Sequence, residues 1–103
     1  MTDTREFDIE DIDEVIHGRV RLGIMAYLSS VDTADFNELR AKLQATDGNL
    51  SVHLRKLEDA GYVAIDKSFV NRKPHTRVTL TNPGRTAFVK YLDAMSRLVG
   101  PQG

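Results

Sequence analysis

Apolar residues recur at helical spacing through the first third of the chain, at Ile12, Ile16, Val20, Ile24, Tyr27 and Leu28. Separations of three and four place these side chains on one face, which predicts an amphipathic helix. The acidic residues from Asp8 to Asp13 supply capping oxygens and negative charge near its start, where the helix dipole favours both. The polar stretch from Ser29 to Thr33 ends the helix.

A short segment at residues 34–36 leads into a second, compact helix. Leu39 and Leu43 face inward, and Asp35 or Asn37 is the expected N-cap. Only three residues, 44–46, separate this helix from the next one, which is enough for no more than a tight turn.

The third helix is expected from about Asp47 to Ala60, with Leu50, Leu54 and Leu57 forming its core stripe. Gly61 stands where a left-handed C-cap needs a glycine. Two helices of this size joined by so short a turn predict a helix-turn-helix unit.

The pattern then changes to a period of two. The alternating residues Val63, Ile65 and Phe69 predict a strand, residues 70–75 a basic, turn-rich loop, and residues 76–80 a second strand. A strand, basic loop and strand directly after the third helix predict a β-hairpin wing.

The last helix is expected over residues 81–99, with Thr81 as cap and Pro83 in its first turn. Its apolar stripe is wider than one small domain can cover, which predicts a second copy against it. The expected two-fold interface comprises Ile12, Ile16, Phe88, Tyr91, Leu92, Met95 and Leu98.

Composition narrows the class of protein. A length of 103 residues favours one domain, and 41% hydrophobic with 28% charged residues is typical of a soluble globular chain. Absence of cysteine excludes disulfides, thiolate metal sites and cysteine redox sensing. No apolar run is long enough to span a membrane and no secretory signal precedes the first helix, so we expect a cytosolic protein and no membrane partner.

Net charge is only −1, but it is unevenly distributed. Residues 1–14, an acidic N-terminal segment, carry seven acids against one arginine, a balance of −6. The remainder has 13 Lys and Arg against eight acids, a balance of +5. One interpretation is that the acidic start only maintains solubility. The other is that confining the acid to one end leaves a basic surface free to meet phosphate.

The outward face of the third helix carries the chemistry of a DNA reader. With Leu50 inward and 100° per residue, small and polar residues lie at its start and two cations follow. Asn and Ser bond base edges, whereas Arg and Lys reach phosphates. Thr46 is expected as the cap, with a hydroxyl that can also bond a phosphate. The predicted DNA-binding residues here are Thr46, Gly48, Asn49, Ser51, Val52, Arg55 and Lys56.

The expected wing adds a second cationic cluster of Arg72, Lys73, His75 and Arg77, with no acid among them. A turn alone does not need this density of positive charge. Arg72 or Lys73 is therefore expected in a neighbouring minor groove or along the DNA backbone.

Three stretches carry a resemblance to a known family: residues 36–43, 46–63 and 72–81. The middle one contains Thr46-Asp-Gly-Asn-Leu-Ser-Val-His-Leu-Arg-Lys-Leu-Glu58. Together they resemble the winged-helix regulators of the MarR/ArsR-like superfamily, and in particular its short winged-helix DNA-binding domain family. The resemblance covers about residues 16–95. It implies a mainly α fold with a small β-hairpin (α+β), in the order α–α–(β)–α–β–wing–β–α, with terminal helices that dimerise and control of transcription initiation. Two features depart from the superfamily. The cysteine motif of metal-sensing members is missing, and there is little room for the extra helices of effector-binding members.

The sequence thus predicts a single domain, 1–103, whose residues 36–80 form a helix-turn-helix with wing and whose residues 81–99 form a dimerisation helix. Its expected function is that of a homodimeric repressor at a pseudo-palindromic operator in double-stranded DNA. No cofactor is expected and the sequence identifies no effector. The alternative is a winged helix that docks proteins without DNA, disfavoured by the cations on the third helix. An enzyme is not expected, because His17, His53 and His75 lie in no catalytic pattern. A metal site of His17 with Asp13 is a minor alternative.

Overall fold

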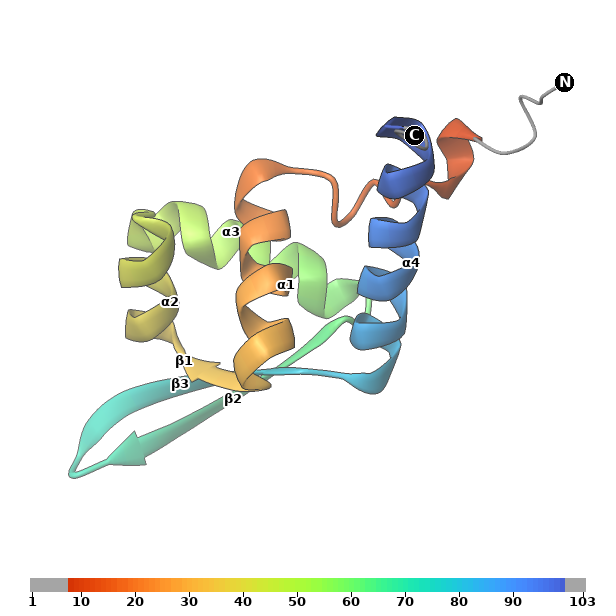
Figure 1. Cartoon of the computed structure of the whole chain (residues 1–103). Coiled ribbons are helices and arrows are strands. Elements are labelled where there is room, and N and C mark those ends of the chain that lie inside the picture. Colours follow the sequence, from red (N-terminus) through yellow and green to blue (C-terminus); the bar gives the residue numbers. More distant parts are fainter. Residues whose placement is uncertain (1–7, 100–103) are drawn as a thin grey trace, which may run out of the picture.

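The computed structural model describes residues 8–99 and has four α-helices and a three-stranded antiparallel sheet, the α+β class expected (Figure 1). A short 3-10 helix precedes them. The elements in chain order are η2 (Ile9–Asp11), α1 (Arg19–Val31), β1 (Thr33–Asp35), α2 (Phe36–Leu43), α3 (Asp47–Asp59), β2 (Val63–Val70), β3 (Lys73–Leu80) and α4 (Asn82–Val99).

The first helix begins later than its apolar spacing predicted. Asp8 caps η2 by accepting the Glu10 N–H at 2.9 Å. One carboxylate oxygen of Asp13 accepts the N–H groups of residues 15 and 16, and this closes a turn rather than a helix. Gly18 is the extended N-cap of α1, with φ −176°. The expectation of a helix through Ile12 and Ile16 was wrong, because the acidic residues cap η2 and this turn instead of α1.

Helix α1 packs its inner face against α2, α3 and the sheet. The close approach to α2 depends on Gly23, where a Cβ would lie 2.8 Å from the Leu43 side chain. The core is shared among all the main elements and includes Ile16, Ile24, Met25, Leu28, Leu39, Leu50, Leu54, Leu57, Val63, Val78, Phe88 and Tyr91.

The helix-turn-helix forms as the sequence predicted. Asp35 caps α2 by accepting the Glu38 N–H at 2.7 Å. Gln44, in a left-handed conformation with φ 53°, ends that helix. Thr46 then caps α3 by accepting the Asn49 N–H at 3.1 Å. Beyond α3, Gly61 has φ +83°, the left-handed conformation for which a glycine was expected there.

The sheet has the strand order β1-β3-β2, and β2 with β3 forms a hairpin that projects beyond the helices (Figure 1). Its turn is tighter than the loop expected at residues 70–75. Val70 pairs with Lys73, so only Asn71 and Arg72 connect the strands, both with positive φ (53° and 68°). Two such residues match a type I′ turn, whose twist suits paired strands. Residues 73–75 therefore belong to β3.

Helix α4 begins at a close contact with the end of α3. Thr81 caps it by accepting the Gly84 N–H at 2.9 Å and donates its own hydroxyl to the Gly61 carbonyl at 2.7 Å. The Thr81 N–H donates to the Tyr62 carbonyl at 3.1 Å. Gly84 is buried directly over that carbonyl, and the absence of a side chain is what lets the two backbones approach.

Candidate nucleic-acid interface

The outward face of α3 is exposed along its whole length. Leu50, Leu54 and Leu57 turn into the core, and the residues between them face solvent except for the half-buried His53. Every residue predicted to contact DNA from this helix is exposed: Thr46, Gly48, Asn49, Ser51, Val52, Arg55 and Lys56.

The start of α3 is held by two interactions. The Thr46 hydroxyl accepts the Asn49 N–H. A hydroxyl that accepts one hydrogen bond still has its O–H donor and a second lone pair for a ligand. Asp47 accepts a hydrogen bond from Arg40 of α2 at 2.6 Å. Both side chains of this ion pair are largely exposed, so the guanidinium offsets the carboxylate that would otherwise repel phosphate at this end of the helix.

His53 lies on the half-buried side of α3. The Nη1 of Arg21 in α1 donates to its Nδ1 at 2.8 Å. Burial lowers the pKa of His53, and the charges of Arg21 and Lys56 lower it further. The ring is therefore neutral near pH 7 and links α3 to α1, while Arg21 also donates from Nε to the Val15 carbonyl at 2.5 Å.

A groove of about 530 Å³ separates α3 from the inner face of the hairpin. Ser51, Arg55 and Glu58 line it from α3, and Lys67 with Thr76 lines it from the two strands. Lys67 and Thr76 are a cross-strand pair. Neither residue was predicted from the sequence, although the period of two that places Ile65 inward also places Lys67 on that face.

The cations predicted for the wing do not all share this face. In register, Asp66 pairs with Arg77, Ser68 with His75 and Val70 with Lys73. Cross-strand partners lie on one side of a sheet, and this side alternates with the one that carries Lys67 and Thr76. Lys73, His75 and Arg77 therefore lie on the face turned away from α3, whereas Arg72 occupies the tip.

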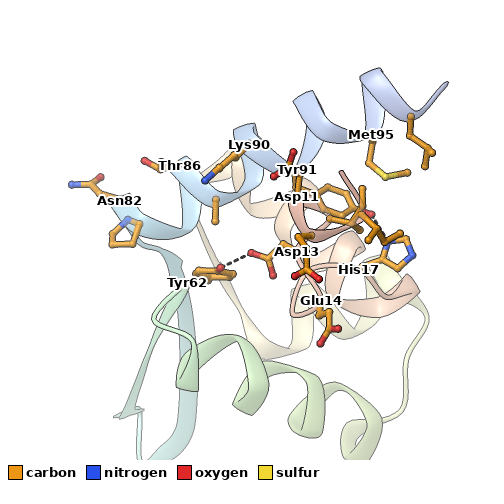
Figure 2. Close-up of a pocket in the computed structure, with 16 residues that line it drawn as sticks. Asp11, Asp13, Glu14, His17, Tyr62, Asn82, Thr86, Lys90, Tyr91 and Met95 are labelled. Atoms are coloured by element: carbon orange, nitrogen blue, oxygen red, sulfur yellow. Dashed lines mark hydrogen bonds between the residues drawn. The ribbon is translucent and has the colours of Figure 1, made fainter. Parts of the chain in front are cut away.

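A second groove, of about 1220 Å³, runs between residues 9–17 and α4 (Figure 2). The Tyr62 hydroxyl donates to Asp13 at 2.5 Å, and the Tyr91 hydroxyl is 2.8 Å from His17 Nδ1. Burial, with the Asp13 hydrogen bond second, raises the pKa of Tyr62 to about 12. These pairs tie residues 13–17 to α4 and to Tyr62, which lies between α3 and β2.

The structure divides the residues expected at a two-fold interface. Ile16, Phe88 and Tyr91 are buried in the chain's own core, and η2 with the turn that follows it packs against α4. This corrects the expectation that they meet a partner. Ile12 and Met95 are half-buried beside the second groove, and Leu92 and Leu98 are 49% and 48% exposed.

Two further exposed apolar side chains were not predicted from the sequence. Val89 on α4 is 61% exposed and Ile9 in η2 is 69% exposed. Val89 lies three residues before Leu92, so helical spacing alone could have identified it.

Within residues 8–99, no group of three or more His, Asp or Glu side chains is arranged to hold a metal ion. Asp13, of the minor metal-site alternative, instead bonds Tyr62 and two backbone N–H groups. No helix among the same residues is long and apolar enough to cross a membrane.

Comparison with known proteins agrees with this architecture. Residues 20–99 match the model of a family described as "Winged helix DNA-binding domain". The chain is 40% identical over 79 residues to the uncharacterized protein MJ0432 of Methanocaldococcus jannaschii. The aligned residues cover 77% of this chain and 86% of that protein.

Solved structures have the same fold. A transcriptional regulator homologue from Pyrococcus horikoshii OT3 superposes with a TM-score of 0.81 at 32% identity, over 88% of this chain and 91% of the other. An ArsR family transcriptional regulator superposes with a TM-score of 0.58 at 18% identity, over 99% of this chain and 98% of the other. The exposed α3, the wing and these matches lead to one assignment. This chain belongs to the winged helix DNA-binding domain family and is a winged-helix transcription regulator.

Proposed function

We propose that the protein acts as a homodimeric repressor that binds a pseudo-palindromic operator in duplex DNA. The observation that carries the proposal is the continuity of one surface: the exposed face of α3 opens directly into the groove where Arg55 faces Lys67 of the wing. An α-helix fits the major groove of B-DNA, and a hairpin beside it then meets the flanking backbone.

In this proposal the side chains of α3 divide by chemistry. Asn49 and Ser51 offer donors and acceptors to base edges, and Val52 offers a methyl surface to thymine. Gly48 has nothing within 4 Å of where a Cβ would lie, so the backbone there can approach the DNA closely. Arg55 and Lys56 reach phosphates, and Thr46 adds a hydroxyl at the start of the helix.

The wing contributes from both faces and from its tip. Lys67 and Thr76 extend the surface of α3 outward, and Arg72 reaches the neighbouring minor groove. Lys73, His75 and Arg77 face away from α3, so in this proposal they contact phosphates farther along the duplex. In prokaryotic cells, such as those of the two archaeal relatives, chromosomal DNA lies in the cytoplasm, so we also propose a cytoplasmic location.

Dimerisation is proposed through α4 and η2. Val89 and Leu92 expose apolar surface on one side of α4, and Leu98 and Ile9 expose more beside the second groove. A two-fold interface covers the same patch on both copies. It would place the two α3 helices in successive major grooves, with half-sites about 34–36 Å apart. Occlusion of a promoter by such a dimer gives repression.

The DNA-binding part is tested with duplex fragments selected from genomic DNA by the purified protein, with affinity followed by fluorescence anisotropy. The double variant Arg55→Ala/Arg72→Ala should bind at least tenfold more weakly, and its slope of log affinity against log salt should fall by about 0.9 for each phosphate that it no longer neutralises. Lys90→Ala, on α4, removes a cation outside the proposed face and should leave affinity unchanged. Unchanged affinity in the double variant would refute the model.

The dimer is tested by light scattering after size exclusion. Leu92→Glu/Leu98→Glu should convert a dimer into a monomer, whereas Val31→Glu, at the exposed end of α1, should not. A wild-type protein that is monomeric at every concentration would refute this part. A reporter gene behind the selected fragment should be expressed more strongly when the regulator is deleted. Lower expression would identify an activator.

A further inference from the structure

The far end of the wing carries apolar side chains that the fold does not use. Phe69 is 74% exposed, the most exposed large apolar side chain among the described residues. Pro74 lies opposite it in register and is also exposed. Neither belongs to the hydrophobic core or to the residues packed against it. A single exposed apolar side chain is ordinary, but two adjacent ones that the fold does not use form a candidate contact surface.

Phe69 lies on the DNA-facing side of the hairpin. The alternation along β2 places Ile65, Lys67 and Phe69 on one face, and the first two line the groove beside α3. Val70 lies on the opposite face and is 51% exposed. Continued outward from Arg55 and Lys67, the surface proposed to bind DNA therefore ends at the phenyl ring.

The charge around this ring identifies the kind of partner. Residues 67–77 contain four Lys and Arg and no acid. A second copy of the same tip would be repelled by these cations, whereas a polyanion is attracted. The combination of cations and an apolar ring suits a nucleic acid, because the backbone is anionic and the bases offer apolar faces.

The length of the wing suits the minor groove. Phe69 lies four residues beyond Ile65, the last half-buried residue of β2, which is about 13 Å at about 3.3 Å per residue. The major groove that would hold α3 is about 12 Å wide. The tip therefore reaches past the phosphate ridge to the next minor groove. That groove, about 6 Å wide, is too narrow for a two-stranded ribbon but admits a single side chain.

We propose that Phe69, supported by Pro74, inserts as an apolar wedge between base pairs from the minor groove and kinks the operator at a pyrimidine–purine step. Apolar wedges of this kind unstack base steps and bend DNA, and pyrimidine–purine steps deform most easily. The inference rests on the proposed DNA-binding function and adds a residue that selects sequence through DNA deformability. It requires no base-specific hydrogen bond from the wing.

The test uses the absence of tryptophan from the sequence. Phe69→Trp and Val70→Trp each place a single indole on opposite faces of the same exposed tip. The probes are two fluorescein-labelled duplexes of about 30 base pairs. One is built of alternating TA steps, and the other is a homopolymeric A-tract without any pyrimidine–purine step. Anisotropy of the label reports binding, and indole emission reports stacking.

With the alternating duplex, emission from Phe69→Trp should fall at least twofold and become protected from acrylamide, while emission from Val70→Trp changes little. Phe69→Ala should weaken binding to the alternating duplex by about tenfold, a loss within the range for one aromatic–base stack. Its binding to the A-tract should change less than twofold. Phe69→Leu, which keeps an apolar wedge, should restore most of the affinity.

Binding with an unquenched, acrylamide-accessible indole at position 69 would overturn the wedge but leave the DNA-binding function intact. An equal response at positions 69 and 70 would overturn it as well. Emission that changes with protein concentration in the absence of DNA would identify the tip as a contact between copies. Absence of any anisotropy change would reject the DNA-binding function, and the wedge with it.

Discussion

Replacement of Gly84 by alanine separates tertiary packing from helix propensity. A Cβ at this position would lie 2.1 Å from the Tyr62 carbonyl oxygen and 2.8 Å from its carbonyl carbon. A non-bonded carbon and oxygen need about 3.3 Å, so the start of α4 must move by about 1 Å. Both clashing atoms are backbone, and no side-chain rotation relieves the contact.

The expected magnitude follows from what this movement disturbs. Overpacking of a close contact costs about 1–3 kcal/mol. The movement also strains the Thr81 N–H bond to Tyr62, worth about 1 kcal/mol, and the Thr81 cap on the Gly84 N–H, worth about 1 kcal/mol. Alanine gains up to about 1 kcal/mol in helix propensity. We expect Gly84→Ala to lower the free energy of unfolding by about 3 kcal/mol.

Urea and thermal unfolding followed by circular dichroism, at one protein concentration, measure this change. A decrease of this size lowers the Tm of a small domain by about 10–20 °C. Gly48→Ala is the matched control, because it lies in the first turn of α3 and nothing is within 4 Å of its added Cβ. It should be neutral or stabilising by less than about 1 kcal/mol. A Gly84→Ala protein as stable as the wild type, or equal decreases in both variants, would refute the reasoning.

Three further predictions concern single contacts. Arg72→Gly should raise the free energy of unfolding by about 0.5–1 kcal/mol, because a residue with a side chain is strained at φ 68°. It should also weaken DNA binding, because it removes a cation. Urea unfolding measures the first effect and anisotropy the second, and a variant in which stability and affinity both rise or both fall would contradict the prediction. Burial, and then the charge of Arg21, lowers the pKa of His53 in the fold, so His53 contributes stability above its unfolded pKa near 6.5 that is lost as the pH falls below it. The free energy of unfolding in urea should therefore fall less between pH 8 and pH 5 in His53→Gln than in the wild type, and identical decreases would exclude the titration of His53 as the cause. Tyr62→Phe removes the hydrogen bond to Asp13 and should lower the free energy of unfolding in urea by about 1 kcal/mol. In an Asp13→Asn background the same change should lower it by measurably less, and equal decreases in the two backgrounds would mean that the two side chains are not coupled.

The helix-turn-helix was predictable because its determinants are local. Leucines at helical spacing define the buried side of α3, and Thr46 and Gly61 mark its ends within one turn of the chain. The same spacing predicted a wrong start for α1, which begins at Arg19 and not before Ile12. Ile12 and Ile16 continue the periodicity, but the Asp13 turn and the extended Gly18 interrupt the helix before Arg19. Both isoleucines still pack inward without it.

In the wing, composition predicted where the cations lie along the chain but not which face of the hairpin carries each one. The cations were correctly located near the hairpin, but their division between two faces depends on register. Register is set by the two-residue turn at Asn71 and Arg72, and an arginine at positive φ is not a signal that sequence patterns favour. One residue of shift would exchange Lys67 with Ser68 on the face beside α3.

The sequence by itself determined the winged-helix order, the outward face of α3 and the caps that bound it, because each depends on neighbours within one or two turns. Tertiary structure decided which apolar residues are used in the core and which remain for a partner. Phe88 and Tyr91 are covered by the chain itself, whereas Leu92 is not. It also decided that Phe69 stands free at the wing tip. Burial and strand register depend on contacts between residues far apart in the chain, and a local pattern does not specify them.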